Sequence, residues 1–145
     1  MIDIKSPLTD AASDVLESMY FVSVLGCSSD PVKPDSNWIW SRLNFSGNGA
    51  GSFGIGTSSV MARIIAENFL GQATEEITQA QIEEVLCELS NMICGSFLSR
   101  YRTEALFDLA HPLCEKTLAA IPAGATTQTF ELGEGVLHLW LEFAA

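Results

Sequence analysis

A chain of 145 residues, 48% hydrophobic and 17% charged, is long and apolar enough to bury the core of one compact domain. Its net charge of −11 would repel nucleic-acid phosphates and anionic lipid, so we expect no nucleic-acid or membrane-surface binding. No apolar run reaches the roughly 18 residues of a membrane span, and the N-terminal segment lacks a signal-peptide pattern. We therefore expect a single cytoplasmic domain over residues 1–145, with no membrane insertion.

The acidity itself leaves two interpretations open, a partner with a basic rim or a surface charged only for solubility. Four cysteines occur without CxxC spacing, which argues against a zinc site. Two of them, seven residues apart on one predicted helix, are separated by about 10.5 Å of rise, too far for a disulfide. Apolar neighbours surround all four, so we expect buried thiols at Cys27, Cys87, Cys94 and Cys114.

The N-terminal third combines a helix, a strand and a loop. Ser6 followed by Pro7 predicts the N-cap and first residue of a helix that ends near Tyr20. The helical spacing of its apolar residues predicts a buried stripe of Ala11, Ala12, Val15, Leu16 and Met19. The β-prone segment 21–26 predicts a strand, and the proline-containing segment 28–37 predicts a loop.

Residues 38–46 and 51–57 predict two strands joined by a turn at Gly47-Asn48-Gly49. The second strand has the sequence GSFGIG at its start. It lacks both the GxGxxG order and the lysine-serine ending of phosphate-binding loops. We therefore expect a glycine-rich strand packed closely against a helix.

Capping signals and alternation define the remainder of the chain. Ser58 or Ser59 and Gly71 bound a predicted helix over 60–70, and a capping box of Thr78 and Gln81 begins a long helix that reaches Tyr101. The segment 103–119 is less regular and predicts a short helix or strand. Residues 126–132 and 136–143 predict a hairpin, with a core face of Leu137, Leu139, Leu141 and Phe143. The whole pattern predicts an α+β fold, an antiparallel β-sheet packed against long α-helices.

The long helix has a distinct polar face. At about 100° per residue from Ile82, the apolar stripe comprises Leu86, Leu89, Ile93, Ser96 and Phe97, with Val85 and Met92 at its border. Near 180–240° from Ile82 the same spacing places Asn91, Glu84, Gly95 and Glu88, flanked by Cys87, Cys94 and Leu98.

Asparagine and glycine are poor residues for a helix interior, where glycine costs about 1 kcal/mol relative to alanine. A partner that approaches closely at Gly95 and meets Glu88 and Asn91 would explain this face. The alternative is a glycine at a helix crossing and a polar face turned to water. His111 and His138 fit no nucleophile triad or metal-ligand spacing, so we expect no metal site.

The segment Glu88-Leu-Ser-Asn91 followed by Gly95 resembles the ExxN…G helix of the CheC, CheX and FliY chemotaxis phosphatases. An N-terminal AxxxVLxxM helix, a glycine-rich strand pair, a helix that ends in Leu70-Gly71 and a closing hairpin follow the order of CheX-like domains, so the resemblance covers most of the chain. The first helix contains no ExxN at residues 10–17, which favours a single-site, CheX-like protein over the two-site CheC arrangement.

The resemblance implies a phosphatase for the aspartyl phosphate of a CheY-like response regulator. Glu88 would pair with the regulator's active-site lysine, and Asn91 would orient the attacking water. Glu84, Gly95 and Leu98 would contact the partner. This chain would bind no cofactor, because the regulator would supply the aspartyl phosphate and Mg²⁺.

Two positions bear on how far the family pattern extends. Glu84 stands where the family often has Asp or Ser, and Pro112 lies near the family's proline. The resemblance also implies a homodimer. We expect the strand face of Val136, His138 and Trp140 to form part of its interface; a second buried face or plain surface is the alternative. A non-catalytic module that binds a regulator or acts like a flagellar switch protein is the alternative function.

Overall fold

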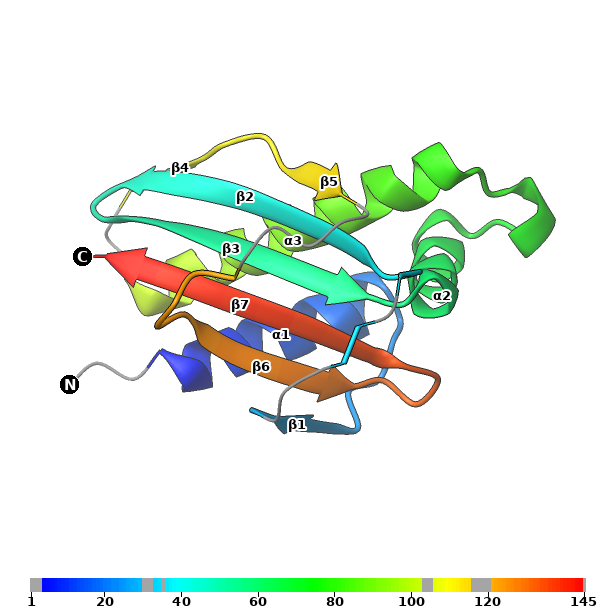
Figure 1. Ribbon diagram of the computed structural model, residues 1–145, viewed down its shortest axis with the longest axis horizontal. Coiled ribbons are helices and arrows are strands. Elements are labelled where there is room, and N and C mark those ends of the chain that lie inside the picture. Colours follow the sequence, from blue (N-terminus) through cyan, green and yellow to red (C-terminus); the bar gives the residue numbers. More distant parts are fainter. Residues whose placement is uncertain (1–3, 30–32, 35, 103–105, 116–120, 145) are drawn as a thin grey trace.

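A computed structural model describes residues 4–29, 33–34, 36–102, 106–115 and 121–144 (Figure 1). Within these residues one antiparallel sheet carries helices on one face. The elements in chain order are α1 (Lys5–Met19), β1 (Gly26–Ser28), β2 (Ile39–Gly47), β3 (Ala50–Thr57), α2 (Ser59–Leu70), the 3-10 turn η1 (Thr74–Glu76), α3 (Gln79–Tyr101), β4 (Phe107–Leu109), β5 (Leu113–Glu115), β6 (Thr126–Glu131) and β7 (Val136–Ala144).

The sheet has the strand order β1-β6-β7-β3-β2, and β2 is bordered on its far side by β4 at one end and β5 at the other. Every described pairing is antiparallel. The antiparallel pairings of β2 with β3 and of β6 with β7 confirm the two predicted hairpins. Gly47 and Gly49 in the first turn, and Gly133 in the second, have positive φ angles, which glycine adopts readily. The α+β fold with an antiparallel sheet against helices is therefore confirmed.

The helices cover the sheet face into which alternate strand residues point (Figure 1). Helix α3 lies against this face and α1 packs on α3. Leu137, Leu139 and Leu141 of β7 are at most 2% exposed and join the core, as predicted. Phe143, the fourth residue of the predicted core face, is half-buried and packs against the edge of the core. Because successive residues of a strand alternate faces, the neighbours of these leucines lie on the opposite face of the sheet.

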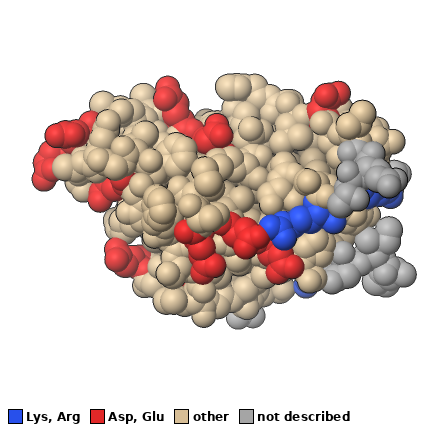
Figure 2. Space-filling view, turned by 180° about the vertical axis from the view of Figure 1, so that it is seen from behind, with Lys and Arg blue, Asp and Glu red and all other residues tan. Residues whose placement is uncertain are grey.

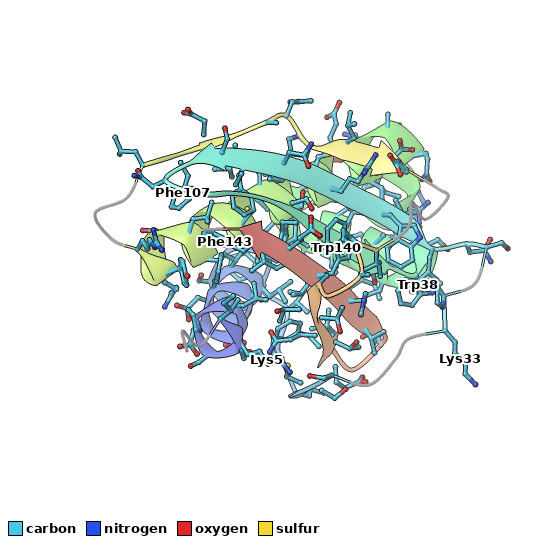
Figure 3. All side chains as sticks on the ribbon, turned by 60° about the vertical axis from the view of Figure 1, so that its left-hand side comes forward. Lys5, Lys33, Trp38, Phe107, Trp140 and Phe143 are labelled. Atoms are coloured by element: carbon cyan, nitrogen blue, oxygen red, sulfur yellow. The ribbon has the colours of Figure 1, made fainter. Side chains whose placement is uncertain are left out.

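That opposite face is closed by tryptophans. A Cβ placed on Gly54 would lie 2.4 Å from the Trp140 ring, and one placed on Gly56 would lie 2.2 Å from the Trp40 ring. The predicted contact between this strand and a helix is confirmed, because β3 contacts α3. Its glycines have another role, since Gly54 and Gly56 accommodate indole rings on the opposite face of the sheet. Figure 3 shows Trp38 toward one end of the sheet, Trp140 near its middle, and Phe107 and Phe143 toward the other end.

The predicted exposure of the β7 face also needs correction. His138 and Trp140 are each only 4% exposed, so they offer little surface to a second protomer. The alternative interpretation, that these residues form a second buried face of the sheet, is the one that the burial of His138 and Trp140 supports. The homodimer itself stays a prediction, without an interface on these side chains.

Three local predictions near the N-terminus are wrong. Helix α1 begins at Lys5 with Ile4 as N-cap, so Ser6 lies inside the first turn instead of capping it. Met19, at the frayed end of this helix, is 45% exposed although the rest of its predicted stripe is buried. Strand β1 covers only Gly26–Ser28, because β6 offers hydrogen-bonding partners there and not over the whole segment 21–26.

The cysteine prediction is only partly right. Cys94 is buried, but Cys27 is exposed on the edge strand β1, and Cys87 and Cys114 are half-buried. No pair among the four forms a disulfide. Among the described residues, no helix combines the length and apolar character of a membrane span.

Candidate functional site

Helix α3 is held in one rotational setting by its ends and its inner face. The side chain of Thr78 accepts the backbone N–H of Gln81, and the Gln81 side chain accepts the N–H of Thr78, which confirms the predicted capping box. On the inner face, the hydroxyls of Ser90 and Ser41 hydrogen-bond at 2.9 Å and tie the helix to β2. Apolar side chains complete this face at Ile82, Val85, Leu86, Leu89, Ile93 and Phe97.

The outward face then presents the predicted polar residues together. Glu84 and Glu88 are exposed, and Asn91 and Gly95 are half-buried. Their helical spacing of three, four and seven residues places them on one side of α3. Within the described part of the chain, the carboxylates of Glu84 and Glu88 and the amide of Asn91 take no hydrogen-bond or ion-pair partner. These groups are therefore available to another molecule.

Gly95 has open space where a side chain would be. No described atom lies within 4 Å of a Cβ built at this position. A helix crossing, the intramolecular explanation for this glycine, is thus absent from the described structure. The helix bears the propensity cost of a mid-helix glycine without any packing gain inside the molecule.

A groove of about 510 Å³ adjoins this polar face. Glu84, Glu88 and Asn91 line one wall, and His111 and Pro112 of the β4–β5 connection line the other. The residues around His111 suggested neither a catalytic nor a metal-binding role, so the sequence did not place it in this groove. The signal available was Pro112, which follows Asn91 at about the family's spacing. The remaining lining residues are Ala80, Glu83 and Cys87.

Leu98 does not contribute the predicted apolar edge. It is 3% exposed, and Cys94 on the same flank is fully buried; both belong to the hydrophobic core. The flank that was predicted to border the polar residues therefore faces the core at Cys94 and Leu98, whereas its third member, Cys87, is half-buried and lines the groove. The surface available to a partner consists of Glu84, Glu88, Asn91 and Gly95, which we call the α3 polar face.

The electrostatics of the α3 polar face are negative. Burial, and to a smaller extent the nearby Glu88 carboxylate, raise the pKa of Tyr20 far above its usual value. The Tyr20 hydroxyl donates a hydrogen bond to the sulfur of Met92, at 3.3 Å. Figure 2 views the molecule from the helical side and shows many more acidic than basic side chains there. A cationic group of a partner would be attracted to this surface.

An exposed aromatic lies next to Tyr20 where α1 ends. The Phe21 side chain is 72% exposed. Its φ angle of 53° is in the left-handed region, which residues other than glycine rarely adopt. The amide of Asn68 on α2 donates to the Phe21 carbonyl at 3.4 Å and so supports this turn. The turn holds an apolar ring outward beside the helix layer.

The groove holds no recognisable metal-ligand set. In the described ranges, no group of three or more His, Cys, Asp or Glu side chains is arranged to hold a metal ion. The chemistry that these residues can offer is hydrogen bonding from the Asn91 amide and charge attraction from the two glutamates.

Comparison with solved structures identifies the fold. A chain of the CheX–CheY–BeF3–Mg²⁺ complex from Borrelia burgdorferi superimposes with a TM-score of 0.78 at 19% identity, covering 100% of both chains. The chemotaxis protein CheX from Desulfovibrio desulfuricans gives a TM-score of 0.76 at 18% identity, over 97% of this chain and 98% of that one. FliY of Thermotoga maritima is more distant, with a TM-score of 0.61 at 12% identity over 94% and 85% of the two chains.

Comparison at the level of sequence adds the family. No curated protein sequence matches this chain. The sequence model of the family described as chemotaxis phosphatase CheX matches residues 39–124, which is more than half of the chain and includes α3 and the β4–β5 wall of the groove. The chain therefore belongs to the CheX family of chemotaxis phosphatases.

Proposed function

We propose that this protein removes the phosphoryl group from the aspartyl phosphate of a CheY-like response regulator. The observation that carries the proposal is the α3 polar face, where Glu88 and Asn91 have no partner in the described structure and Gly95 leaves open space. The Borrelia burgdorferi relative was crystallised with CheY, BeF3 and magnesium, which supports a CheY-like partner for this chain. A cytoplasmic location would suit such a partner.

In the proposed complex, Glu88 pairs with a lysine of the regulator and docks the helix. The exposed carboxylate needs no rearrangement inside this protein, because it breaks no existing bond. Asn91, one helical turn further, then reaches the regulator's active site, and the missing side chain at Gly95 lets the regulator's backbone approach. Glu84 extends the acidic docking surface, and Phe21 supplies an apolar contact at its side.

The chemistry requires positioning more than activation. An acyl phosphate is already reactive, so a water molecule held in line with the phosphorus–oxygen bond is sufficient for hydrolysis. The Asn91 amide accepts a hydrogen bond from that water and donates others without adding a negative charge near the phosphoryl oxygens. The products are inorganic phosphate and the free aspartate, and Mg²⁺ belongs to the regulator.

The test measures phosphate release from phosphorylated CheY-like regulators of the same genome. We expect Asn91→Ala to lower the rate by about 100-fold, the order of magnitude for losing alignment of a reacting group. Binding of the regulator should stay close to that of wild type, since Glu88 is intact. Asn44→Ala is the matched control, because Asn44 is exposed on the sheet face opposite the helices.

Glu88→Gln separates docking from chemistry. It should weaken binding of the regulator, and the loss should be larger at low ionic strength because the docking contact is between charges. Full phosphatase activity in the Asn91→Ala protein would exclude the proposal. Binding of the regulator without any acceleration of phosphate release, by wild type as well, would establish the non-catalytic interaction module.

A further inference from the structure

Two of the four cysteines meet beside the α3 polar face. Cys114 on β5 lies directly opposite Ser41 on β2, so their side chains share the sheet face that α3 covers. The Ser41 hydroxyl lies 3.8 Å from the sulfur of Cys87 on α3. Cys87 and Cys114 are thus both neighbours of Ser41, one across the helix–sheet contact and the other across the strand pair.

The surroundings of Cys87 favour its thiolate. The neighbouring Cys114 side chain has the largest effect in this direction, and the Ser41 hydroxyl and His111 act in the same direction. Together these interactions outweigh burial and the Glu83 charge and lower the pKa of Cys87. Interaction with the Cys87 side chain, and then burial, raise the pKa of Cys114.

The other two cysteines lack this setting. Burial raises the pKa of Cys94 to about 12, although it lies on the same helix as Cys87. Burial also raises the pKa of Cys27, despite the exposure of that residue on β1. Reactivity of a thiol depends on thiolate content and access together. Only the sulfur of Cys87 combines both within the described structure, because Cys87 lines the groove.

We propose that Cys87 and Cys114 form an oxidation site, in which Cys87 reacts with a peroxide that enters the groove and Cys114 then closes a disulfide. The Cys87 thiolate attacks one peroxide oxygen, the oxygen–oxygen bond breaks, and the leaving hydroxide takes a proton to become water. Cys114 attacks the sulfur of the resulting sulfenic acid, and a second water leaves as the sulfur–sulfur bond forms. The two thiols lose two electrons and two protons, and the peroxide is reduced to two waters.

The disulfide would alter the groove. The Cys87 thiol contacts the Pro112 carbonyl at 3.7 Å, and this contact is lost when the sulfur turns to Cys114. Pro112 and His111 form the groove wall opposite Glu88 and Asn91. Resting on the proposed function, we expect oxidation to weaken binding of the regulator severalfold and reduction to restore it.

The experiment treats the full chain with hydrogen peroxide and follows each cysteine by peptide mass mapping. We expect a Cys87–Cys114 crosslink to form at least tenfold faster than oxidation of Cys27 or Cys94. Cys114→Ser should instead accumulate a sulfenic acid at Cys87 that dimedone traps. Cys27→Ser is the matched control and should crosslink like wild type.

The outcomes separate this site from the proposed function. Equal oxidation rates at all four cysteines, or no Cys87–Cys114 crosslink in wild type, would overturn the oxidation site; the wild-type mapping requires no variant to fold. A crosslink that leaves regulator binding unchanged would overturn its effect on docking. The crosslink could also weaken binding of a regulator that this protein never dephosphorylates faster. That result would support the oxidation site and exclude the proposed phosphatase activity.

Discussion

Glycines interrupt two regular elements of this molecule, strand β3 and helix α3, and their surroundings are opposite. On β3, the Trp140 ring occupies the space where a Gly54 side chain would stand. On α3, the space beside Gly95 is open in the described structure. The first glycine is explained by the fold, while the second is not. A residue that costs helix stability and gains no packing within the described structure agrees with the proposal that a partner approaches closely at Gly95.

The largest effect that we expect from this comparison is a loss of folding stability when the strand glycine Gly54 is substituted. Gly54→Ala places a methyl group 2.4 Å from a buried indole ring, which is well inside van der Waals contact. We expect the free energy of unfolding to fall by about 1–3 kcal/mol, as for overpacking elsewhere. Urea denaturation measures the change. Wild-type stability in this variant would mean that Trp140 moves freely, and the closed tryptophan face would have to be abandoned.

The same substitution on α3 should have the opposite sign. Gly95→Ala enters open space and gains helix propensity, so we expect the free energy of unfolding to rise by about 1 kcal/mol. Under the proposed function, binding of the phosphorylated regulator should nevertheless weaken severalfold, because the new methyl group would occupy the space proposed for the partner's backbone. Denaturation and a binding titration on one preparation measure both quantities.

The decisive observation is the combination of the two readouts. A more stable protein with unchanged binding would show that no partner contacts this position, and Gly95 would have no functional explanation. A less stable protein would contradict the open space beside Gly95. Gly54→Ala is the control for a purely structural loss, because its effect on binding should not exceed the loss of folded protein.

Local signals in the sequence predicted the α3 polar face well. Residues of one helix are placed by a fixed angle per residue, and the Thr78–Gln81 capping box fixed where that helix begins. The positions of Glu88 and Asn91 on one outward face follow from these two facts alone. The sequence did not show that their side chains lack partners, since this depends on every neighbouring element.

Features that depended on strand register were not predicted. GSFGIG was expected to pack against a helix, and β3 does contact α3. The register of β3 between β2 and β7, however, places Trp40 and Trp140 over its glycines. Alternation along β7 correctly separated two faces, yet it does not tell whether the second face is covered. The groove wall at His111 and Pro112 likewise arises from the pairing of β5 with β2, which no local pattern encodes.

The smallest effect that we predict is a pH dependence from the closed sheet face. Burial lowers the pKa of His138 in the folded protein below the value of about 6.5 expected when unfolded. Between these two values the unfolded state binds more protons, so stability is complete above pH 6.5 and falls as the pH drops below it.

Urea denaturation at pH 7.5 and pH 5.5 should therefore show a loss of stability at the lower pH that is smaller in His138→Gln than in wild type. The His138 Nδ1 atom and the Thr129 hydroxyl share a hydrogen bond of 3.0 Å. Glutamine can retain such a bond and does not titrate in this pH range. The difference between the two pH slopes, and not the absolute stability of the variant, is the measured quantity. Equal pH slopes in wild type and His138→Gln would indicate that His138 takes up a proton in the folded state as readily as in the unfolded chain. The sheet face that carries Gly54 and Trp140 would then be open to water, as the α3 polar face is.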